Sequence, residues 1–126
     1  MAGFPACSTP RDVSKAGPAR PGVERQTGVL DIQVFRDETV IRMTNTTARP
    51  LAAGRMWVND WYSRPFPGLA VGESLELPLS EFRDQNGDAF RAGGFFAADR
   101  PDRVVLAQIE TDGQLLGLVV VGERTD

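Results

Sequence analysis

Residues 104–121 read VVLAQIETDGQLLGLVVV, and they carry the clearest folding signal in the chain. Two runs rich in β-branched and aliphatic residues flank Asp112-Gly113, and an Asp-Gly pair between such runs is the strongest short signal for a β-hairpin. The second run is apolar on both faces, which is typical of a strand in the middle of a sheet. The stretch therefore predicts two paired strands, 104–109 and 115–121, with the second one central.

Upstream of this hairpin, hydrophobic residues recur with a period of two from Val29 onward, as in β-strands. The further strands expected are 30–34 and 40–44 as a hairpin, 55–62, 75–79, and an irregular strand 90–97 weakened by Gly93-Gly94. Pro78 favours a sheet edge for strand 75–79, because proline lacks the N–H that a ladder needs. Two prolines within residues 64–68 predict an exposed connection there rather than a strand.

About seven short strands, with no window of helical period, predict an all-β fold. The expected architecture is a small antiparallel β-sandwich, immunoglobulin-like, with a small open barrel as the alternative. With one cysteine, the chain lacks the inter-sheet disulfide of antibody domains. A length of 126 residues fits one domain of ordinary size, which we expect to span residues 29–126.

Charge and composition remove several classes of function. The formal net charge is −3, so no overall basic field attracts nucleic acid, and no such partner is expected. The chain has no histidine and one cysteine, which excludes histidine-based triads, cysteine–histidine dyads and four-thiolate zinc sites. Asp60 and Asp84 can be named as a carboxylate pair, but nothing in the sequence brings them into a cleft. We therefore expect neither an enzyme nor a cofactor.

The N-terminal residues 1–28 have the composition of a flexible tether, with prolines and glycines among scattered charges. Within them, Phe4-Pro5-Ala6-Cys7 resembles the end of a bacterial lipoprotein signal, in which a small residue precedes the lipidated cysteine. The preceding basic and apolar regions of such a signal are absent. Cys7 is thus either the lipidation site of a trimmed or mis-started precursor or an incidental thiol, and we favour the first. The longest apolar run, 115–121, is too short to cross a bilayer.

A cluster of aromatic residues supplies the candidate ligand-binding site. Both tryptophans and the only tyrosine lie within ten positions, among polar side chains that can form hydrogen bonds. The candidate ligand-binding residues are Trp57, Asn59, Asp60, Trp61, Tyr62, Arg64 and Phe66. On one continuous strand, the two tryptophans would project from the same face about 13 Å apart. The alternative, which we favour, is that one tryptophan fills the core and the other is partly exposed.

Two polar motifs indicate loops rather than sites. Asp84, Asn86 and Asp88 alternate like the first ligands of a calcium loop, but Ala89 and Phe95 stand where that loop needs glycine and glutamate. A polar turn without metal is expected there. Asn45-Thr46-Thr47 satisfies the glycosylation sequon, and we expect an unmodified loop.

Long stretches within 57–113, including Trp57-Val58-Asn59-Asp60-Trp61, are similar to small bacterial lipoproteins of unassigned function. The resemblance implies a single domain in the cell envelope, lipid-anchored or periplasmic/extracellular, and no activity. We expect a non-catalytic binding or structural module, touching the membrane only through a lipid anchor. The partner expected is a protein or a glycan, met at a sheet edge or the aromatic region. The alternative is a carbohydrate-binding module that uses the aromatic cluster.

Overall fold

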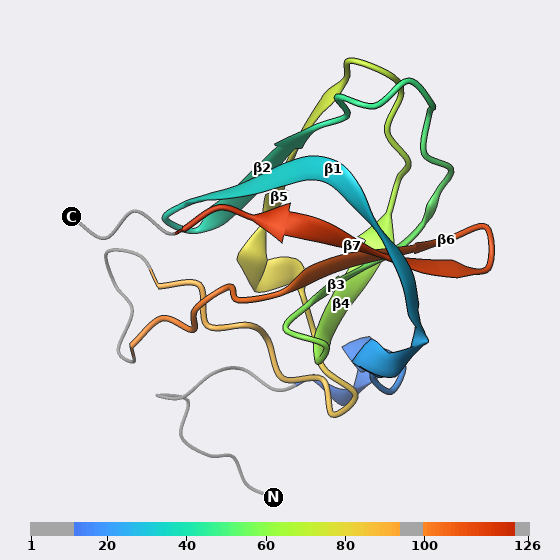
Figure 1. The fold of residues 1–126 in the computed structure, drawn as a ribbon. Helices are drawn as coiled ribbons and strands as arrows, with labels where there is room; N and C mark the ends of the chain where they lie inside the picture. Colours follow the sequence, from blue (N-terminus) through green and yellow to red (C-terminus); the bar gives the residue numbers. More distant parts are fainter. Residues whose placement is uncertain (1–11, 94–99, 123–126) are drawn as a thin grey trace, which may run out of the picture.

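The computed structural model describes residues 12–93 and 100–122, and their fold is all-β (Figure 1). The strands are β1 (Gln26–Asp37), β2 (Val40–Thr44), β3 (Gly54–Val58), β4 (Tyr62–Phe66), β5 (Ser74–Pro78), β6 (Ala107–Thr111) and β7 (Gln114–Val120). Three short 3₁₀ turns accompany them: η1 (Val13–Lys15), η2 (Val23–Arg25) and η3 (Leu79–Glu81). No α-helix occurs in the part of the chain that the structure describes.

The seven strands form one curled sheet with the order β4-β3-β6-β7-β1-β2-β5. All neighbouring pairs are antiparallel except β1 and β7, which run parallel. The expectation of a purely antiparallel fold is therefore wrong at this pair. A parallel pair needs a long crossover, and here the crossover is the whole chain between the first strand and the last.

The core lies inside the curl, because alternate side chains from both halves of the sheet, β1-β2-β5 and β4-β3-β6-β7, point into it. Ile32 of β1 and Ile41 of β2 meet Met56 of β3 and Ile109 of β6 in one cluster of buried side chains. Phe82, in the loop after β5, is also fully buried within this cluster. Each such side chain contributes about 1.5–3 kcal/mol by leaving water, so the two halves stabilise each other through a shared interior.

The C-terminal hairpin agrees with its sequence signal. Asp112 and Gly113 both have positive φ, 51° and 76°, as a two-residue turn of the I′ type requires. β7 lies between β6 and β1, so its predicted central position is confirmed. Of the run 104–109, only the part from Ala107 onward pairs as a strand, and β6 extends to Thr111.

The strand predicted over 55–62 is two strands, and this is the largest correction to the expected strand list. β3 ends at Val58, Asn59 and Asp60 turn the chain with φ values of 60° and 55°, and β4 returns antiparallel. The stretch 64–68, expected as an exposed connection, begins inside β4. Asn and Asp tolerate positive φ without glycine, so this turn carries no Asp-Gly or Asn-Gly signal.

Both edge strands carry a proline at a position where the missing N–H costs no ladder bond. Ser63 of β4 exchanges two hydrogen bonds with Arg83 on the outer side of the sheet, and Pro65, two residues on, faces the same way. In β5, Leu79 N and Glu73 O bond toward β2, so Pro78 faces outward. The predicted edge position of strand 75–79 is confirmed, and Pro65 follows the same rule.

The N-terminal strap, residues 12–25, is attached to the domain by regular hydrogen bonds. The backbone N–H of Asp12 donates to Gly87 O (3.1 Å), and that of Gly17 donates to Asp84 O (2.9 Å). Gly87 permits this approach, since a Cβ there would lie 2.3 Å from Asp12 O. The tether expected over 1–28 is thus not free from residue 12 onward, and β1 already begins at Gln26.

Two further predictions concern residues that lie partly or wholly outside the described ranges. Residues 90–93 are not a strand, and the remainder of the run 90–97 lies outside the described residues. Cys7 also lies outside them.

Candidate functional site

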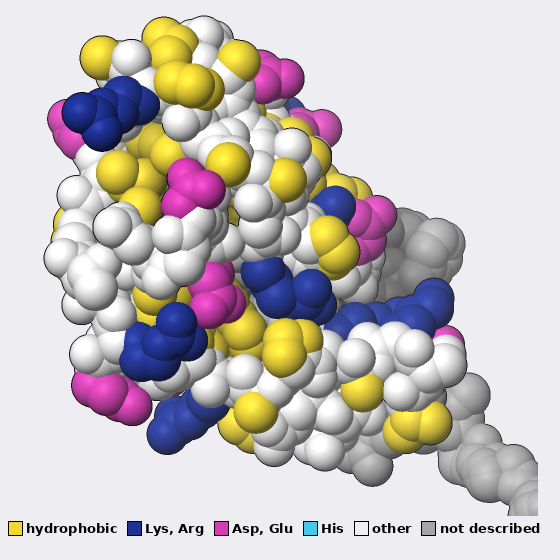
Figure 2. Space-filling model, turned by 90° about the vertical axis from the view of Figure 1, so that its right-hand side faces the viewer, with side chains coloured by type: hydrophobic (Ala, Val, Ile, Leu, Met, Phe, Trp, Pro, Cys, Tyr) yellow, Lys and Arg dark blue, Asp and Glu magenta, His cyan; other side chains and the backbone are white. Residues whose placement is uncertain are grey.

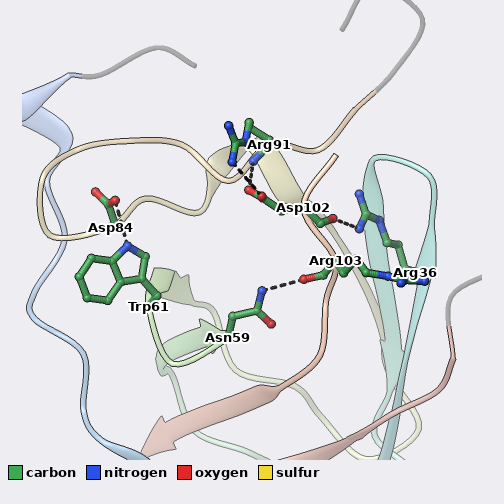
Figure 3. Close-up of polar contacts among 7 residues, drawn as sticks. All are labelled: Arg36, Asn59, Trp61, Asp84, Arg91, Asp102 and Arg103. Carbon is green, nitrogen blue, oxygen red and sulfur yellow. Dashed lines mark hydrogen bonds and ion pairs between the residues drawn. The ribbon is translucent and has the colours of Figure 1, made fainter. Parts of the chain in front are cut away.

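The turn between β3 and β4, residues 59–61, lies at the centre of the predicted ligand site. Its first residue, Asn59, holds the segment that leads into β6. Asn59 Oδ1 accepts the backbone N–H groups of Val105 (2.8 Å) and Leu106 (3.2 Å), and Nδ2 donates to Arg103 O (2.7 Å). Figure 3 shows the last of these contacts. The Asn59 side chain thus uses three of its hydrogen bonds on the backbone of residues 103–106.

Asp60, the second residue of the turn, holds the N-terminal strap. Its carboxylate is buried, with 8% of the residue exposed, and accepts the Gly22 N–H at 3.1 Å. Arg20 lies 3.5 Å from the other oxygen, but its side chain is 62% exposed. The ion pair is therefore worth little, because solvent screens it, and the backbone hydrogen bond carries the attachment.

Trp61, the third residue, holds the loop after η3. Its Nε1–H donates to Asp84 Oδ2 at 3.1 Å, and Figure 3 shows the indole directed at this carboxylate. Asp84 is 4% exposed, and its other oxygen accepts the N–H groups of Asn86 (2.8 Å) and Asp88 (2.9 Å). Asp84, Asn86 and Asp88 thus lie in the expected polar turn, which the Asp84 carboxylate organises.

The remaining predicted site residues are dispersed. Phe66 points into the core and is 1% exposed, whereas Trp57 is 2% exposed and lies outside the main core cluster. Trp57 Nε1 donates to Glu110 (3.3 Å), which also pairs with Arg25 of the N-terminal strap. Because the turn intervenes, Trp57 and Trp61 do not share one strand face. The favoured alternative holds in part: Trp57 is buried and Trp61 is partly exposed, but Trp57 does not belong to the main core cluster that it was expected to fill.

Tyr62 and Arg64 are half-buried on β4 and are used locally. The Tyr62 ring meets Phe90 edge-on, with centroids 5.3 Å apart. Burial raises the pKa of the Tyr62 phenol, and the negative charges of Asp102 and Asp84 add to this effect. Arg64 pairs with Glu81 at 2.5 Å. The seven predicted residues therefore supply no continuous exposed stacking surface.

Next to this region, the segments flanking residues 94–99 are tied together. The Arg91 N–H donates to the Asp102 carboxylate (2.9 Å), and the Asp102 N–H donates to Arg91 O (2.8 Å). Arg36 of β1 donates to Asp102 O and Ala92 O and lies over the Phe90 ring, 5.5 Å from its centroid. Figure 3 shows the contacts of Asp102 with Arg91 and Arg36 above the β3–β4 turn. Their groups are satisfied internally and form a structural clamp.

A groove of about 470 Å³ lies at the other end of the sheet, between residues 47–52 and the β6–β7 turn. Its floor contains Leu30, Leu51 and Leu116, all half-buried, and its rim carries Arg49 and Asp112. Thr111 Oγ1 donates to Ala52 O (2.9 Å) and ties the two walls together. Figure 2 looks onto this side of the molecule and shows hydrophobic side chains exposed between charged ones.

The sequence did not indicate this groove. Both walls were recognisable as loops, but nothing in their residues shows that they meet. The Asn45 sequon borders it and is closed to modification in this fold. Asn45 is fully buried, with its Nδ2 donating to Arg49 O (2.8 Å) and Leu69 O (3.0 Å).

Comparison with protein-family models, curated proteins and solved structures gives no match for this chain. Among residues 12–93 and 100–122, no helix has the length and apolarity to span a membrane. The site must therefore be interpreted from its own geometry.

Proposed function

We propose that the curled sheet is an immunoglobulin-like sandwich whose two halves are joined by β1. Labelling the strands in chain order as A, B, C, C′, E, F and G gives the halves A-B-E and C′-C-F-G. These are the groupings of immunoglobulin domains, apart from the edge strand D. The strand order and the shared core support this assignment. In this scheme, the groove lies between the B–C and F–G loops.

We propose that the protein is a non-catalytic binding module that presents this groove to an extended segment of a partner protein. The observation that carries the proposal is an apolar floor open to solvent between two tied loops. Its size suits one or two aliphatic side chains, and the opposite charges of Arg49 and Asp112 on the rim suit the dipoles of a peptide backbone. Antibody variable domains bind through the corresponding loops, which is support by analogy only.

A photo-crosslinking residue at Ala48, on the groove rim, tests this proposal in cells. The control is the same residue at Ala19, which is also exposed but lies in the N-terminal strap. We expect a discrete protein adduct from position 48 and none from position 19. The adduct is expected to vanish when Ala52→Trp fills the groove. An adduct that survives Ala52→Trp, or equal adducts from both positions, would contradict the proposal.

We also propose a cell-envelope location with a lipid on Cys7. The support is the Phe4-Pro5-Ala6-Cys7 sequence, in which a small residue precedes the cysteine. Labelled palmitate should appear on the natively expressed precursor and not on its Cys7→Ser variant. An unlabelled, cytosolic protein would overturn the proposed location without bearing on the groove.

A carbohydrate-binding role at the aromatic cluster is the weaker candidate. Trp57 and Phe66 are buried, and the polar groups of Asn59 and Asp60 are engaged within the protein. A glycan held there would have to displace these contacts.

A further inference from the structure

A hollow of about 430 Å³ lies where β1 and β2 separate, on the outer face of the sheet. Beyond the pair Val34↔Met43, the two strands are no longer paired in the ladder. Alternate residues of a strand point to one face, so two rows of side chains border the hollow. They are Asp31, Gln33 and Phe35 from β1, and Arg42, Thr44 and Thr46 from β2 and the residue after its end.

Phe35 is the aromatic member of this set and is 46% exposed. It stands opposite Arg42 in the β1–β2 ladder. Most phenylalanines of the described chain are buried, Phe66, Phe82 and Phe90 each at 1% exposure or less. A half-exposed ring at the border of a hollow offers a flat apolar surface to a ligand.

Several of the polar groups are fixed in place. Arg42 is held between Asp37 (3.1 Å) and Glu76 (2.7 Å). The Thr44 hydroxyl pairs with Ser74 on β5 (2.7 Å), and the Thr46 hydroxyl donates to Asp31 O (2.9 Å). The two hydroxyl contacts pre-organise the walls and lower the ordering cost of binding. The ion pairs of Arg42 join exposed side chains and add little, because solvent screens them.

Two polar groups, in contrast, are uncommitted. Within residues 12–93 and 100–122, the Asp31 carboxylate and the Gln33 amide make no hydrogen bond or ion pair. They stand on the same strand face as Phe35. Alternate strand residues are about 6.6–7 Å apart, so Gln33 lies about 7 Å and Asp31 about 13 Å from Phe35 along the strand. The three residues together offer an aromatic surface, an N–H donor and oxygen acceptors spread along one strand face.

We propose that this hollow binds a neutral glycan that runs along β1, with Phe35 stacking on one sugar ring and Gln33 and Asp31 bonding hydroxyls of the rings that follow. A sugar ring combines an apolar C–H face with a rim of hydroxyls that both donate and accept. The guanidinium of Arg42 pairs with the carboxylates of Asp37 and Glu76, and Asp31 adds a third carboxylate further along the hollow. The excess negative charge disfavours acidic sugars. The site differs from the aromatic cluster and from the groove between residues 47–52 and the β6–β7 turn, here called the loop-end groove.

The test is an NMR titration of the folded protein with a panel of neutral hexasaccharides: β-1,4-glucan, β-1,3-glucan, β-1,4-mannan and β-1,4-linked N-acetylglucosamine. A hexamer of galacturonic acid is the acidic comparator. We expect at least one neutral probe to shift the amides of 31–35 and 42–46 saturably. The acidic probe is expected to leave them unchanged.

Variants separate a built site from non-specific contact. Phe35→Ala should weaken binding by about tenfold and Phe35→Trp should retain it, because the larger ring keeps the stacking surface. Gln33→Ala should weaken binding by roughly three- to tenfold. Val71→Ala, a half-exposed hydrophobic position that does not border the hollow, is the matched control and should bind as the parent does.

The proposal is overturned if no neutral probe shifts these amides, if the acidic hexamer binds equally well, or if Phe35→Ala binds as the parent does. None of these outcomes depends on a protein partner at the loop-end groove.

Discussion

Two hairpin turns of this protein share a backbone conformation and differ in what their side chains do. Asn59-Asp60 and Asp112-Gly113 both turn through two residues of positive φ. The side chains of the first turn hold the strap and the entry to β6, and the next residue, Trp61, holds the 84–88 loop. Asp112 and Gly113 are exposed, and a Cβ on Gly113 would meet nothing within 4 Å. The backbone conformation of a turn therefore does not predict how much its side chains contribute to the stability of the fold.

The largest expected effect that tests this difference is Asn59→Ala against Asp112→Ala. Asn59→Ala removes three hydrogen bonds, leaves two N–H groups without their acceptor and puts alanine at positive φ. We expect a loss of about 2–4 kcal/mol in the free energy of unfolding. Asp112→Ala should cost only about 0.5–1 kcal/mol, from the backbone conformation alone. Urea denaturation of both variants measures the difference, and equal losses would refute the contrast between the turns.

Asp60→Ala should have the next largest effect, about 1–3 kcal/mol, because the Gly22 N–H loses its acceptor and alanine takes a position of positive φ. Asp60→Asn keeps an acceptor oxygen and loses only the screened pairing with Arg20, so it should stay close to the parent. Hydrogen exchange at Gly22 should accelerate in Asp60→Ala and not in Asp60→Asn. Acceleration in both variants would mean that the ion pair holds the strap.

The strap and the first turn also show why the sequence was only partly informative. Asp112-Gly113 predicted its hairpin, because an Asp-Gly pair between two apolar runs is typical of a two-residue turn with positive φ. Asn59-Asp60 stands among tryptophans and a tyrosine, which prefer strands. The alternating sequence pattern of β3 therefore continues through the turn, and it predicts residues 55–62 as one strand. The strap has the composition of a linker, and its attachment depends on acceptors at Asp60, Asp84 and Gly87, far away in the sequence.

Some tertiary features followed from local chemistry and others did not. Pro78 indicated an edge strand, because a residue without an N–H is tolerated there without loss of a ladder hydrogen bond. The apolar residues on both faces of β7 indicated a strand in the middle of the sheet. The parallel pairing of β1 with β7 leaves no local signal, since either strand would look the same beside another partner. The two hollows arise from the same kind of long-range meeting, at Leu30 with Leu51 and at Asp31 with Thr46.

Trp61→Phe should have a smaller effect, about 1 kcal/mol, because it removes one hydrogen bond and keeps most of the ring. Asp84 retains the N–H groups of Asn86 and Asp88 as donors. We therefore expect exchange of these two amides to rise modestly while the strand amides stay protected. Loss of the whole fold in Trp61→Phe would show that the indole does more than hold the 84–88 loop.

The smallest effect concerns Tyr62, which directly follows this turn and is the only tyrosine. Its raised pKa means that the folded state favours the neutral phenol. The resulting stabilisation is complete below pH about 10, the unfolded value, and is lost as pH rises through the folded pKa. Tyrosinate absorbance should titrate above the ordinary value in the folded protein and return to it in urea. Asp102→Asn should lower the folded midpoint, and a midpoint at the ordinary value would contradict the burial of this phenol.

The outward-facing prolines of β4 and β5 bear on how molecules of this protein behave beside one another. A sheet grows by adding strands to an edge whose N–H and C=O groups are unpaired. Here, Pro65 and the bridge from Arg83 interrupt one border, and Pro78 ends the other within a five-residue strand. Neither border offers a full template for a neighbour's strand. Edge-to-edge pairing between neighbouring copies is therefore disfavoured, even where many copies lie close together.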